Sequence, residues 1–202
     1  MSPEELLRIL SQAARLKTTM RHCYTEADRK ESVADHSWRI ALMAMLMTGV
    51  EEFHALNMDR VIRMCLIHDL GESFTGDIPT FEKTAADAGE EDDLFHRWVD
   101  SFPEPQRTEW TELLTEMEAL ETREARLYKA LDKLEALISH NESEISTWLP
   151  LEYDLQLTYG QENMQFSEYL KEFRAAVDEW TRRKIREEAL HDPLTVDTEQ
   201  FE

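Results

Sequence analysis

A chain of 202 residues, 42% of them hydrophobic, is long and apolar enough to bury a core, which excludes an intrinsically disordered protein. The formal net charge of −21 excludes a general binder of nucleic-acid polymers, because such binders are usually basic. Only 5 glycines interrupt long stretches of helix-forming residues. We therefore expect an all-α bundle of about six to eight helices, one domain over residues 1–191, and a frayed tail over 192–202.

The first part of the chain contains three predicted helices. The first begins at Pro3 after a serine N-cap, with Glu5 in capping-box spacing. Two more are predicted at about 33–50 and 59–72, where apolar residues recur at helical spacing. Residues 17–32 have no clean period and are predicted to form a loop, and no part of the sequence indicates a convincing strand.

The second part begins with a loop over 73–83 and a polar segment over 84–93 that we expect to be mobile. Helical segments are predicted after it at 93–102, 104–120, 122–142 and 162–190, with a connection or short helix over 148–160. The last helix has an apolar face that we expect to pack on the protein's own core. This face contains Tyr169, Leu170, Phe173, Val177 and Trp180.

The cysteine content and the first residues bear on location. Cys23 and Cys65 are too few for a disulfide framework and lack zinc-finger spacing. Glu4 and Glu5 stand where a signal peptide has basic residues, and no apolar run reaches the roughly 18 residues of a membrane span. We expect a protein of the reducing cytoplasm with no membrane partner.

The stretch "IHDLGESFTGDIP", residues 67–79, brings four ionisable groups directly after an apolar run. A helix that runs to Glu72 would present His68, Asp69 and Glu72 on one face. A buried carboxylate is costly unless it is paired or binds a metal, so a divalent cation would explain the pattern. Taken singly, each acidic residue also has an ordinary structural explanation. Glu72 could simply end a helix, and Asp77 could be a turn residue.

A transition-metal site usually takes about four protein ligands, or three with water, so further ligands must come from elsewhere. His36 near the start of the second helix and Asp132 in "ALDKLEAL" are the candidates. Alone, His36 reads as an ordinary histidine and Asp132 as a solvated helix position. With His68 and Asp69, however, they form a joint pattern of two imidazoles and two carboxylates. This donor set favours one divalent Co, Mn, Zn, Fe or Ni ion over Ca.

Four segments carry a resemblance to a known family: 16–21, 29–44, 68–83 and 130–137. They resemble the HD-domain metal-dependent phosphohydrolases, most of all the branch of HD-domain 5′-deoxynucleotidases. The resemblance implies an HD-domain helical bundle and a nucleoside 5′-monophosphate, most typically a deoxyribonucleotide, as the small phosphorylated substrate. It also implies a homodimer. The positions that match the metal ligands are His36, His68, Asp69 and Asp132.

The same resemblance assigns roles to other residues. Glu72 and Asp77 match an acidic pair that assists catalysis. Arg21 matches an arginine that contacts the substrate phosphate, and it lies in a region, 8–39, where basic side chains outnumber acidic ones. The other residues expected to bind the substrate are His22, Thr80 and Lys83. His22 stands where bacterial relatives have a tryptophan, which leaves the sugar and base contacts open, whereas Thr80 and Lys83 match polar positions near the bound nucleotide. The segment 84–93 is not part of the family pattern.

Hydrolysis of a phosphate monoester, which is a dianion, needs charge neutralisation and a positioned nucleophile. We expect attack by a metal-bound water that Glu72 orients or deprotonates, while Arg21 grips phosphate oxygens with its planar fork. Asp77 follows Gly76 on a loop, where it would protonate the leaving 5′ oxygen. The roles of Glu72 and Asp77 are interchangeable on the sequence alone.

Two alternatives stay open. The chain could act on another phosphate ester, such as a cyclic nucleotide, a nucleoside triphosphate or an alarmone, and His54 is a conceivable stray ligand. It could also be a non-catalytic helical module that binds a nucleotide or a partner protein. The presence of both Glu72 and Asp77 argues against the second alternative, because binding alone requires neither carboxylate.

Overall fold

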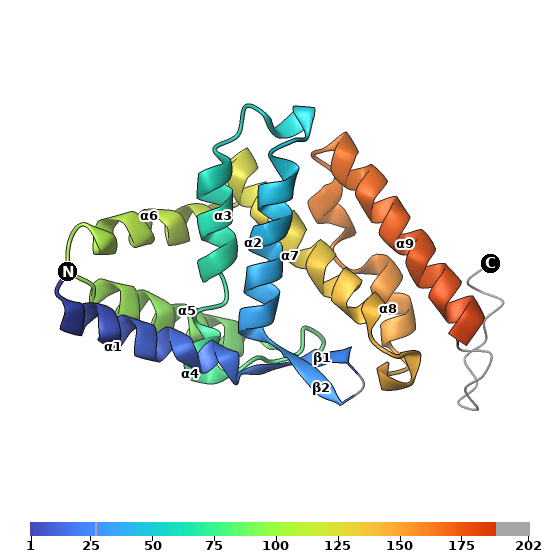
Figure 1. Ribbon diagram of the computed structural model, residues 1–202, viewed down its shortest axis with the longest axis horizontal. Helices are drawn as coiled ribbons and strands as arrows, with labels where there is room; N and C mark the ends of the chain where they lie inside the picture. The colour runs from blue at the N-terminus through green and yellow to red at the C-terminus, as the bar shows by residue number, and fades with distance from the viewer. Residues whose placement is uncertain (27, 189–202) are drawn as a thin grey trace. The chain divides into compact units, whose positions relative to one another are not determined.

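A computed structural model describes residues 1–26 and 28–188. The chain is predominantly helical, which confirms the predicted fold class (Figure 1). Its contacts divide it into two compact units: Met1–His22 with Glu31–Tyr128, and Cys23–Lys30 with the chain from Lys129 onward. The predicted tail, 192–202, lies outside the described residues. The single domain over 1–191 therefore stays a prediction.

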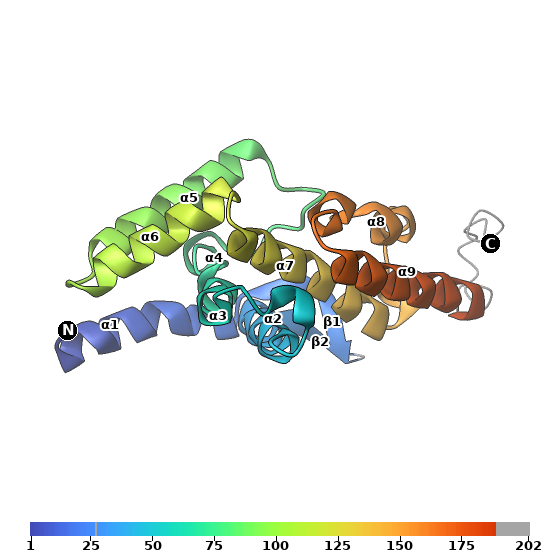
Figure 2. The ribbon, with the colours of Figure 1, turned by 90° about the horizontal axis from the view of Figure 1, so that it is seen from above.

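The first unit is built from short and medium helices, drawn from blue to yellow in Figures 1 and 2. The capping box predicted for the first helix is present, with Ser2 accepting from the Glu5 amide. Among these helices α2 packs along α3, and α5 packs along α6. The elements are α1 (Pro3–Ala13), α2 (Val33–Met47), α3 (Met58–Ile67), α4 (Glu72–Thr75), α5 (Ala85–Asp100), α6 (Gln106–Ala119) and the start of α7 (Arg123–Glu142), with 3-10 turns at Ala14–Lys17 and Glu51–Phe53.

A β-hairpin replaces much of the predicted loop over 17–32. Strands β1 (Met20–Glu26) and β2 (Arg29–Ser32) pair in a two-stranded sheet, so the expectation of no strand was wrong. The strands are short, and their turn lacks the Asn-Gly or Asp-Gly signature that marks a hairpin in a sequence. The second strand ends at Ser32, whose hydroxyl accepts from the Asp35 amide and begins α2.

Two helix boundaries near the candidate site also differ from the prediction. Helix α3 ends at Ile67, and residues 68–71 continue in turns before the single turn of α4. His68, Asp69 and Glu72 therefore do not share one helix face by α-helical continuity. The polar segment 84–93, expected to be mobile, forms the first turns of α5, because Thr84 and Asp87 make a capping box there.

The second unit contains most of α7, α8 (Glu152–Thr158) and α9 (Glu168–Glu188), with 3-10 turns at Ile145–Thr147 and Gln161–Met164. Helix α8 packs against α9. The predicted apolar face of α9 is only partly buried: Leu170 and Val177 are inside, whereas Tyr169 is 38% exposed. The same buried face carries polar residues, which form a hydrogen-bonded network.

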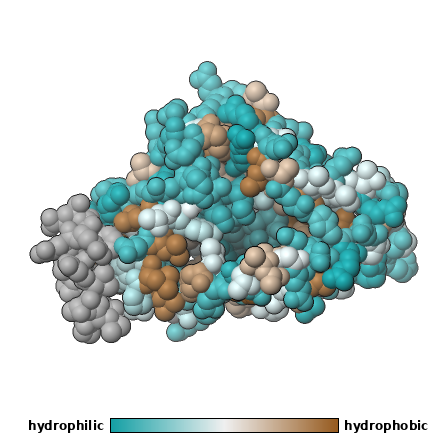
Figure 3. Space-filling model, turned by 180° about the vertical axis from the view of Figure 1, so that it is seen from behind, coloured by the Kyte–Doolittle hydropathy of each residue, from teal (hydrophilic) through white to brown (hydrophobic). Residues whose placement is uncertain are grey.

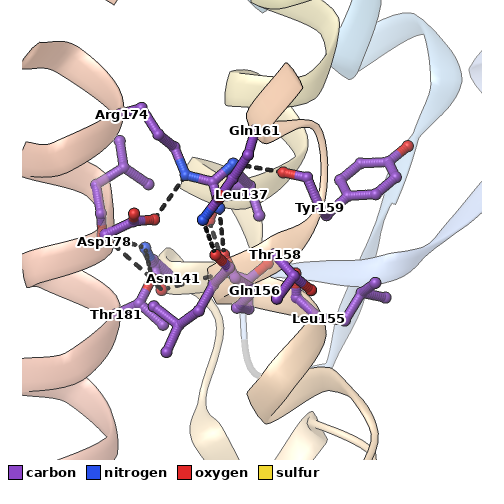
Figure 4. Close-up of polar contacts among 12 residues, drawn as sticks. Leu137, Asn141, Leu155, Gln156, Thr158, Tyr159, Gln161, Arg174, Asp178 and Thr181 are labelled. Carbon is purple, nitrogen blue, oxygen red and sulfur yellow. Dashed lines mark hydrogen bonds and ion pairs between the residues drawn. The ribbon is translucent and has the colours of Figure 1, made fainter. Parts of the chain in front are cut away.

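This network centres on Arg174 of α9 (Figure 4). Its guanidinium donates to Asp178 Oδ1 at 2.6 Å and to the backbone carbonyls of Gln156 and Tyr159. A second group of contacts joins Asn141 of α7 to Thr181 and to the Gln156 amide. These bonds satisfy buried polar groups that would otherwise destabilise the unit.

The surface is predominantly hydrophilic on the face drawn in Figure 3, with separate patches of hydrophobic residues. This agrees with the net charge of −21. Among the helices that the structure describes, none is long and apolar enough to cross a membrane.

Candidate metal and phosphate site

Two imidazole nitrogens face one oxygen of Asp69. His36 lies in the first turns of α2 and is fully buried, with Nε2 3.7 Å from Asp69 Oδ2. His68 follows the end of α3, and its Nε2 lies 3.0 Å from the same oxygen. One ligand atom from each of the three residues lies within 4.8 Å of the others. The structure thus brings together three of the four predicted metal ligands.

The hydrogen bonding of His68 fits a bound cation. Its Nδ1 lies 3.0 Å from the carbonyl oxygen of Cys65. Because a carbonyl oxygen only accepts hydrogen bonds, Nδ1 carries the ring hydrogen, and Nε2 of the neutral ring presents a lone pair toward Asp69 Oδ2. Two acceptors at that distance repel each other unless a cation, either a proton or a metal ion, interacts with both. Two imidazoles and a carboxylate suit a divalent transition metal.

Glu72, the first residue of α4, is a buried carboxyl group beside this cluster. Its side chain is 6% exposed, and its Oε2 has no hydrogen-bond partner among the described residues. Burial, together with the charges of Asp69 and Asp77, raises the pKa of Glu72 to about 10. In the metal-free protein Glu72 therefore holds a proton at neutral pH.

Asp77 lies in the segment between α4 and α5, directly after Gly76. The φ of Gly76 is +85°, a conformation that favours glycine, and it turns the chain after α4. Burial raises the pKa of Asp77, the guanidinium of Arg21 opposes this shift, and the charge of Asp69 adds to it. A carboxyl group with a raised pKa suits the role of a general acid at neutral pH.

Arg21, predicted to contact the phosphate, and Lys83, predicted to lie near the bound nucleotide, each contact a carboxylate. Arg21 on β1 donates from Nη1 to Glu31 Oε2 at 2.7 Å, and Glu31 is 2% exposed. Lys83 donates to Glu91 Oε2 at 2.7 Å. Neither carboxylate was predicted, since Glu31 lies in a segment interpreted as a loop and Glu91 in a polar segment expected to be mobile. The helical spacing of Glu91 with Phe95 and Trp98, all buried on α5, is the signal that would have indicated the second one.

Of the other residues expected at the nucleotide, His22 packs against an aromatic ring and Thr80 is exposed. The ring of His22 meets Phe81 edge-on, with centroids 5.7 Å apart. His22, which was expected in place of a tryptophan, thus packs on an aromatic neighbour. Thr80 lies in an exposed turn of the same segment. Phe81 was not predicted as part of the site.

Comparison with known proteins places the chain in a family. The HD domain family profile matches residues 13–174. The chain belongs to the HD domain family. It is 34% identical to 5′-deoxynucleotidase HDDC2 of Mus musculus over 143 residues, which are 69% of this chain and 70% of that protein. The corresponding human protein is 32% identical over 142 residues, covering 69% and 67%.

Solved structures agree with this assignment. The HD domain described here is similar to a predicted metal-dependent phosphohydrolase from Magnetospirillum magnetotacticum MS-1, with a TM-score of 0.74 and 31% identity over 90% of this chain and 93% of that one. An HD-domain phosphohydrolase from Listeria innocua shares the fold, with a TM-score of 0.56, 19% identity, and coverage of 96% and 91%. Membership of this family of metal-dependent phosphohydrolases implies a divalent metal.

Asp132, the fourth predicted ligand, belongs to the second compact unit of this HD domain protein. It lies on α7 and is 7% exposed, so the reading of Asp132 as a solvated surface residue was wrong. Its Oδ2 contacts Lys129 Nζ at 3.0 Å and Lys133 Nζ at 3.3 Å. Its place in the ligand set stays a prediction.

Proposed function

We propose that this HD domain protein is a metal-dependent phosphohydrolase that removes the phosphate from nucleoside 5′-monophosphates, with deoxyribonucleotides as its preferred class. The observation that carries the proposal is the convergence of two imidazole nitrogens on Asp69 Oδ2, close to the buried carboxyl group of Glu72. The relatives named 5′-deoxynucleotidase, which match about two thirds of the chain, support the substrate class.

His36, His68 and Asp69 would hold the divalent ion, and we retain Asp132 as a fourth ligand on the family resemblance. Bound there, the ion would polarise a phosphate oxygen and lower the pKa of a water. Cobalt, manganese, zinc, iron and nickel all suit nitrogen and oxygen donors, so the choice among them is a matter for measurement.

The chain's own cations would bind and orient the substrate. Arg21 presents a planar fork of N–H donors, and its Nη1 donates to Glu31 Oε2. A guanidinium fork of this kind is suited to binding phosphate oxygens in pairs. Lys83 adds a point charge near the acidic residues. Together they would offset the repulsion between a dianionic phosphate and Asp69, Glu72 and Asp77.

The carboxyl groups of Glu72 and Asp77 would transfer protons during the reaction. Glu72 would accept a proton from the attacking water or orient that water. Asp77 would donate a proton to the leaving 5′ oxygen, because its raised pKa favours the protonated form. A cation held by Asp69 would bring the pKa of Glu72 down toward neutrality, where a base works best. We place His22 and Thr80 near the sugar and base.

We also propose that the protein is a homodimer. Several large apolar side chains are exposed on the first unit, among them Leu7 at 63%, Trp38 at 62% and Leu46 at 72%. Leu7 and Trp38 line a groove of about 550 Å³. A second copy that covers this face would bury apolar surface of a kind that marks interfaces. Light scattering at micromolar concentration checks the expected mass of two chains.

The cytoplasmic location of the protein stays a prediction.

The test is phosphate release from a panel of phosphate esters. The panel contains deoxyribo- and ribonucleoside 5′-monophosphates, 3′-monophosphates, cyclic nucleotides and triphosphates, each with Co, Mn, Zn and Mg. The variant His68→Ala should lose metal and on the order of 10³-fold of its activity. The variant His54→Ala is the matched control, since it removes an exposed histidine, and it should match the wild type.

The outcomes separate the possibilities. Metal-dependent release from 5′-deoxyribonucleotides, abolished only in the His68 variant, supports the proposal. Turnover of another class alone would keep the metal and replace the substrate. Metal binding without any turnover would instead indicate a binding module. Loss of activity in the His54 variant would reassign the metal ligands.

A further inference from the structure

Glu91 is a buried carboxylate that none of the proposed roles uses. It lies on α5 and is 9% exposed. Its side chain packs against Gly71, in the turn between α3 and α4 that carries the candidate site. A Cβ built on Gly71 would lie 2.7 Å from Glu91 Cγ and 3.4 Å from Oε1. A larger residue at position 71 would displace the carboxylate, so the turn and Glu91 are fitted to each other.

The carboxylate of Glu91 holds the ammonium group of Lys83. The two atoms Lys83 Nζ and Glu91 Oε2 are 2.7 Å apart; the Glu91 side chain is 12% exposed and the Lys83 side chain 25%. Burial disfavours the charge of Lys83, but the hydrogen bond and charge of Glu91, with the charges of Glu72 and Asp69, raise the pKa of Lys83 above its ordinary value. The charge of Lys83 in turn acts on Glu72 and Asp77.

A gain in stability does not by itself explain the ion pair between Lys83 and Glu91. Burial raises the pKa of Glu91, and although Lys83 opposes that shift, Asp69 adds to it. A further carboxylate beside Asp69 and Glu72 therefore adds repulsion to a cluster that is already acidic. Replacement of a buried ion pair by apolar residues is often neutral or stabilising, so the pair calls for another explanation.

That explanation lies in the flexibility of lysine. A lysine side chain that is not held loses rotamer entropy when a ligand fixes it. The ammonium group has three N–H donors, and a contact with Glu91 leaves two for another acceptor. Arg21 likewise donates to a buried carboxylate, that of Glu31.

We propose that Glu91 is a positioning residue that fixes Lys83 Nζ over the acidic cluster, where it binds the phosphate of the substrate. This inference rests on the proposed function, since it assumes that Lys83 contacts a phosphate. It assigns a role to the polar segment 84–93. Glu91 itself does not touch the substrate.

The test is a double-mutant cycle on the full-length, metal-loaded protein. The variants are Glu91→Ala, Lys83→Ala, the double variant and Glu91→Gln, with the exposed neighbour Glu90→Ala as control. Calorimetry measures the affinity for inorganic phosphate, and steady-state kinetics with a 5′-deoxyribonucleotide separates KM from kcat. Urea unfolding checks that each variant is folded.

Glu91→Ala should weaken phosphate binding and raise KM about tenfold, with a smaller change in kcat. The double variant should equal Lys83→Ala within about twofold, because Glu91 acts through Lys83. Glu91→Gln should recover most of the affinity, since its amide oxygen still accepts from Lys83. Glu90→Ala should match the wild type.

Three results would overturn the inference: an equal loss from Glu91→Ala whether or not Lys83 is present, no loss from Glu91→Ala at all, or no phosphate binding by the wild type. Failure of the proposed function is read separately, as the absence of turnover in a wild type that still binds phosphate. In that case the cycle on phosphate affinity still decides the role of Glu91.

Discussion

The buried polar groups around Arg174 and those around Glu72 are satisfied to very different degrees. In the second unit, each end of the Arg174 guanidinium has an acceptor, and Asn141 and Thr181 exchange hydrogen bonds (Figure 4). In the first unit, Glu72 Oε2 is buried with no hydrogen-bond partner among the described residues, and its neighbours are carboxylates.

The difference separates two uses of buried polarity. A network with its donors and acceptors paired fixes the packing of helices and adds specificity to the fold. An unpaired buried carboxyl group lowers stability, and such groups persist where chemistry needs them. The network around Arg174 therefore indicates stability, and the cluster around Glu72 indicates function. Single substitutions can alter one side of this contrast at a time.

Removal of Arg174 should produce the largest loss of stability. Arg174→Ala leaves Asp178, which is 9% exposed, without its ion pair and removes donors from two backbone carbonyls. We expect a loss of about 3–5 kcal/mol of unfolding free energy, measured by urea denaturation. The exposed Arg183→Ala on the same helix is the control and should change stability by less than about 0.5 kcal/mol. Similar values for the two variants would contradict a stabilising network.

Substitution of Gly160 should produce the second largest loss of stability, because Gly160 lies in the loop that presents the Tyr159 carbonyl to Arg174. Its φ of +67° is left-handed, and an added Cβ would lie 2.7 Å from Lys133 Cβ. Gly160→Ala should cost about 2–3 kcal/mol by thermal or urea unfolding. Gly89→Ala is the matched control, since it lies within α5 with open space around it, and it should gain about 0.5–1 kcal/mol. A harmless Gly160→Ala would show that this loop readily rearranges.

Glu72→Gln should raise the stability of the metal-free protein, whereas the two preceding substitutions lower it. The pKa of Glu72 is about 4.5 in the unfolded chain and about 10 in the metal-free fold, so the folded state binds the extra proton between these values. Stability therefore falls as pH rises through this window. A neutral glutamine avoids the cost, and we expect a gain of about 1–3 kcal/mol at pH 7.

The pH dependence supplies the control for this substitution. In the presence of a chelator, the advantage of Glu72→Gln should vanish near pH 4 and grow toward pH 9, as measured by urea unfolding at each pH. The same variant should lose phosphohydrolase activity. An advantage that is independent of pH would show that packing, and not the proton, accounts for the gain.

Local signals in the sequence predicted much of the fold. The serine before Pro3 and the acid at Glu5 gave the first helix its start, and α1 begins there. The helix that was expected to reach Glu72 ends at Ile67, and the chain turns at 68–71, where Gly71 packs against Glu91. That contact joins distant segments, so no local pattern encodes it.

The site was predictable where residue type alone identifies the chemistry. His36, His68 and Asp69 were expected together, and the structure places them together. Glu31 and Glu91 were missed because their significance depends on tertiary contacts with Arg21 and Lys83. An acidic residue in a charged segment is typical of a solvated surface, and for Glu91 only its helical spacing with Phe95 and Trp98 indicates otherwise.

The hydrogen bond from His68 Nδ1 to the Cys65 carbonyl has a consequence for how this site can vary. A helix leaves the carbonyls of its last turn without amide donors, and Cys65 lies in the last turn of α3. The imidazole therefore serves as a C-terminal cap while its other nitrogen faces Asp69. A cysteine or aspartate ligand at position 68 has no N–H to give that carbonyl. An exchange of ligand type would thus remove the helix cap together with the nitrogen donor, so histidine is favoured there by the backbone as well as by the metal.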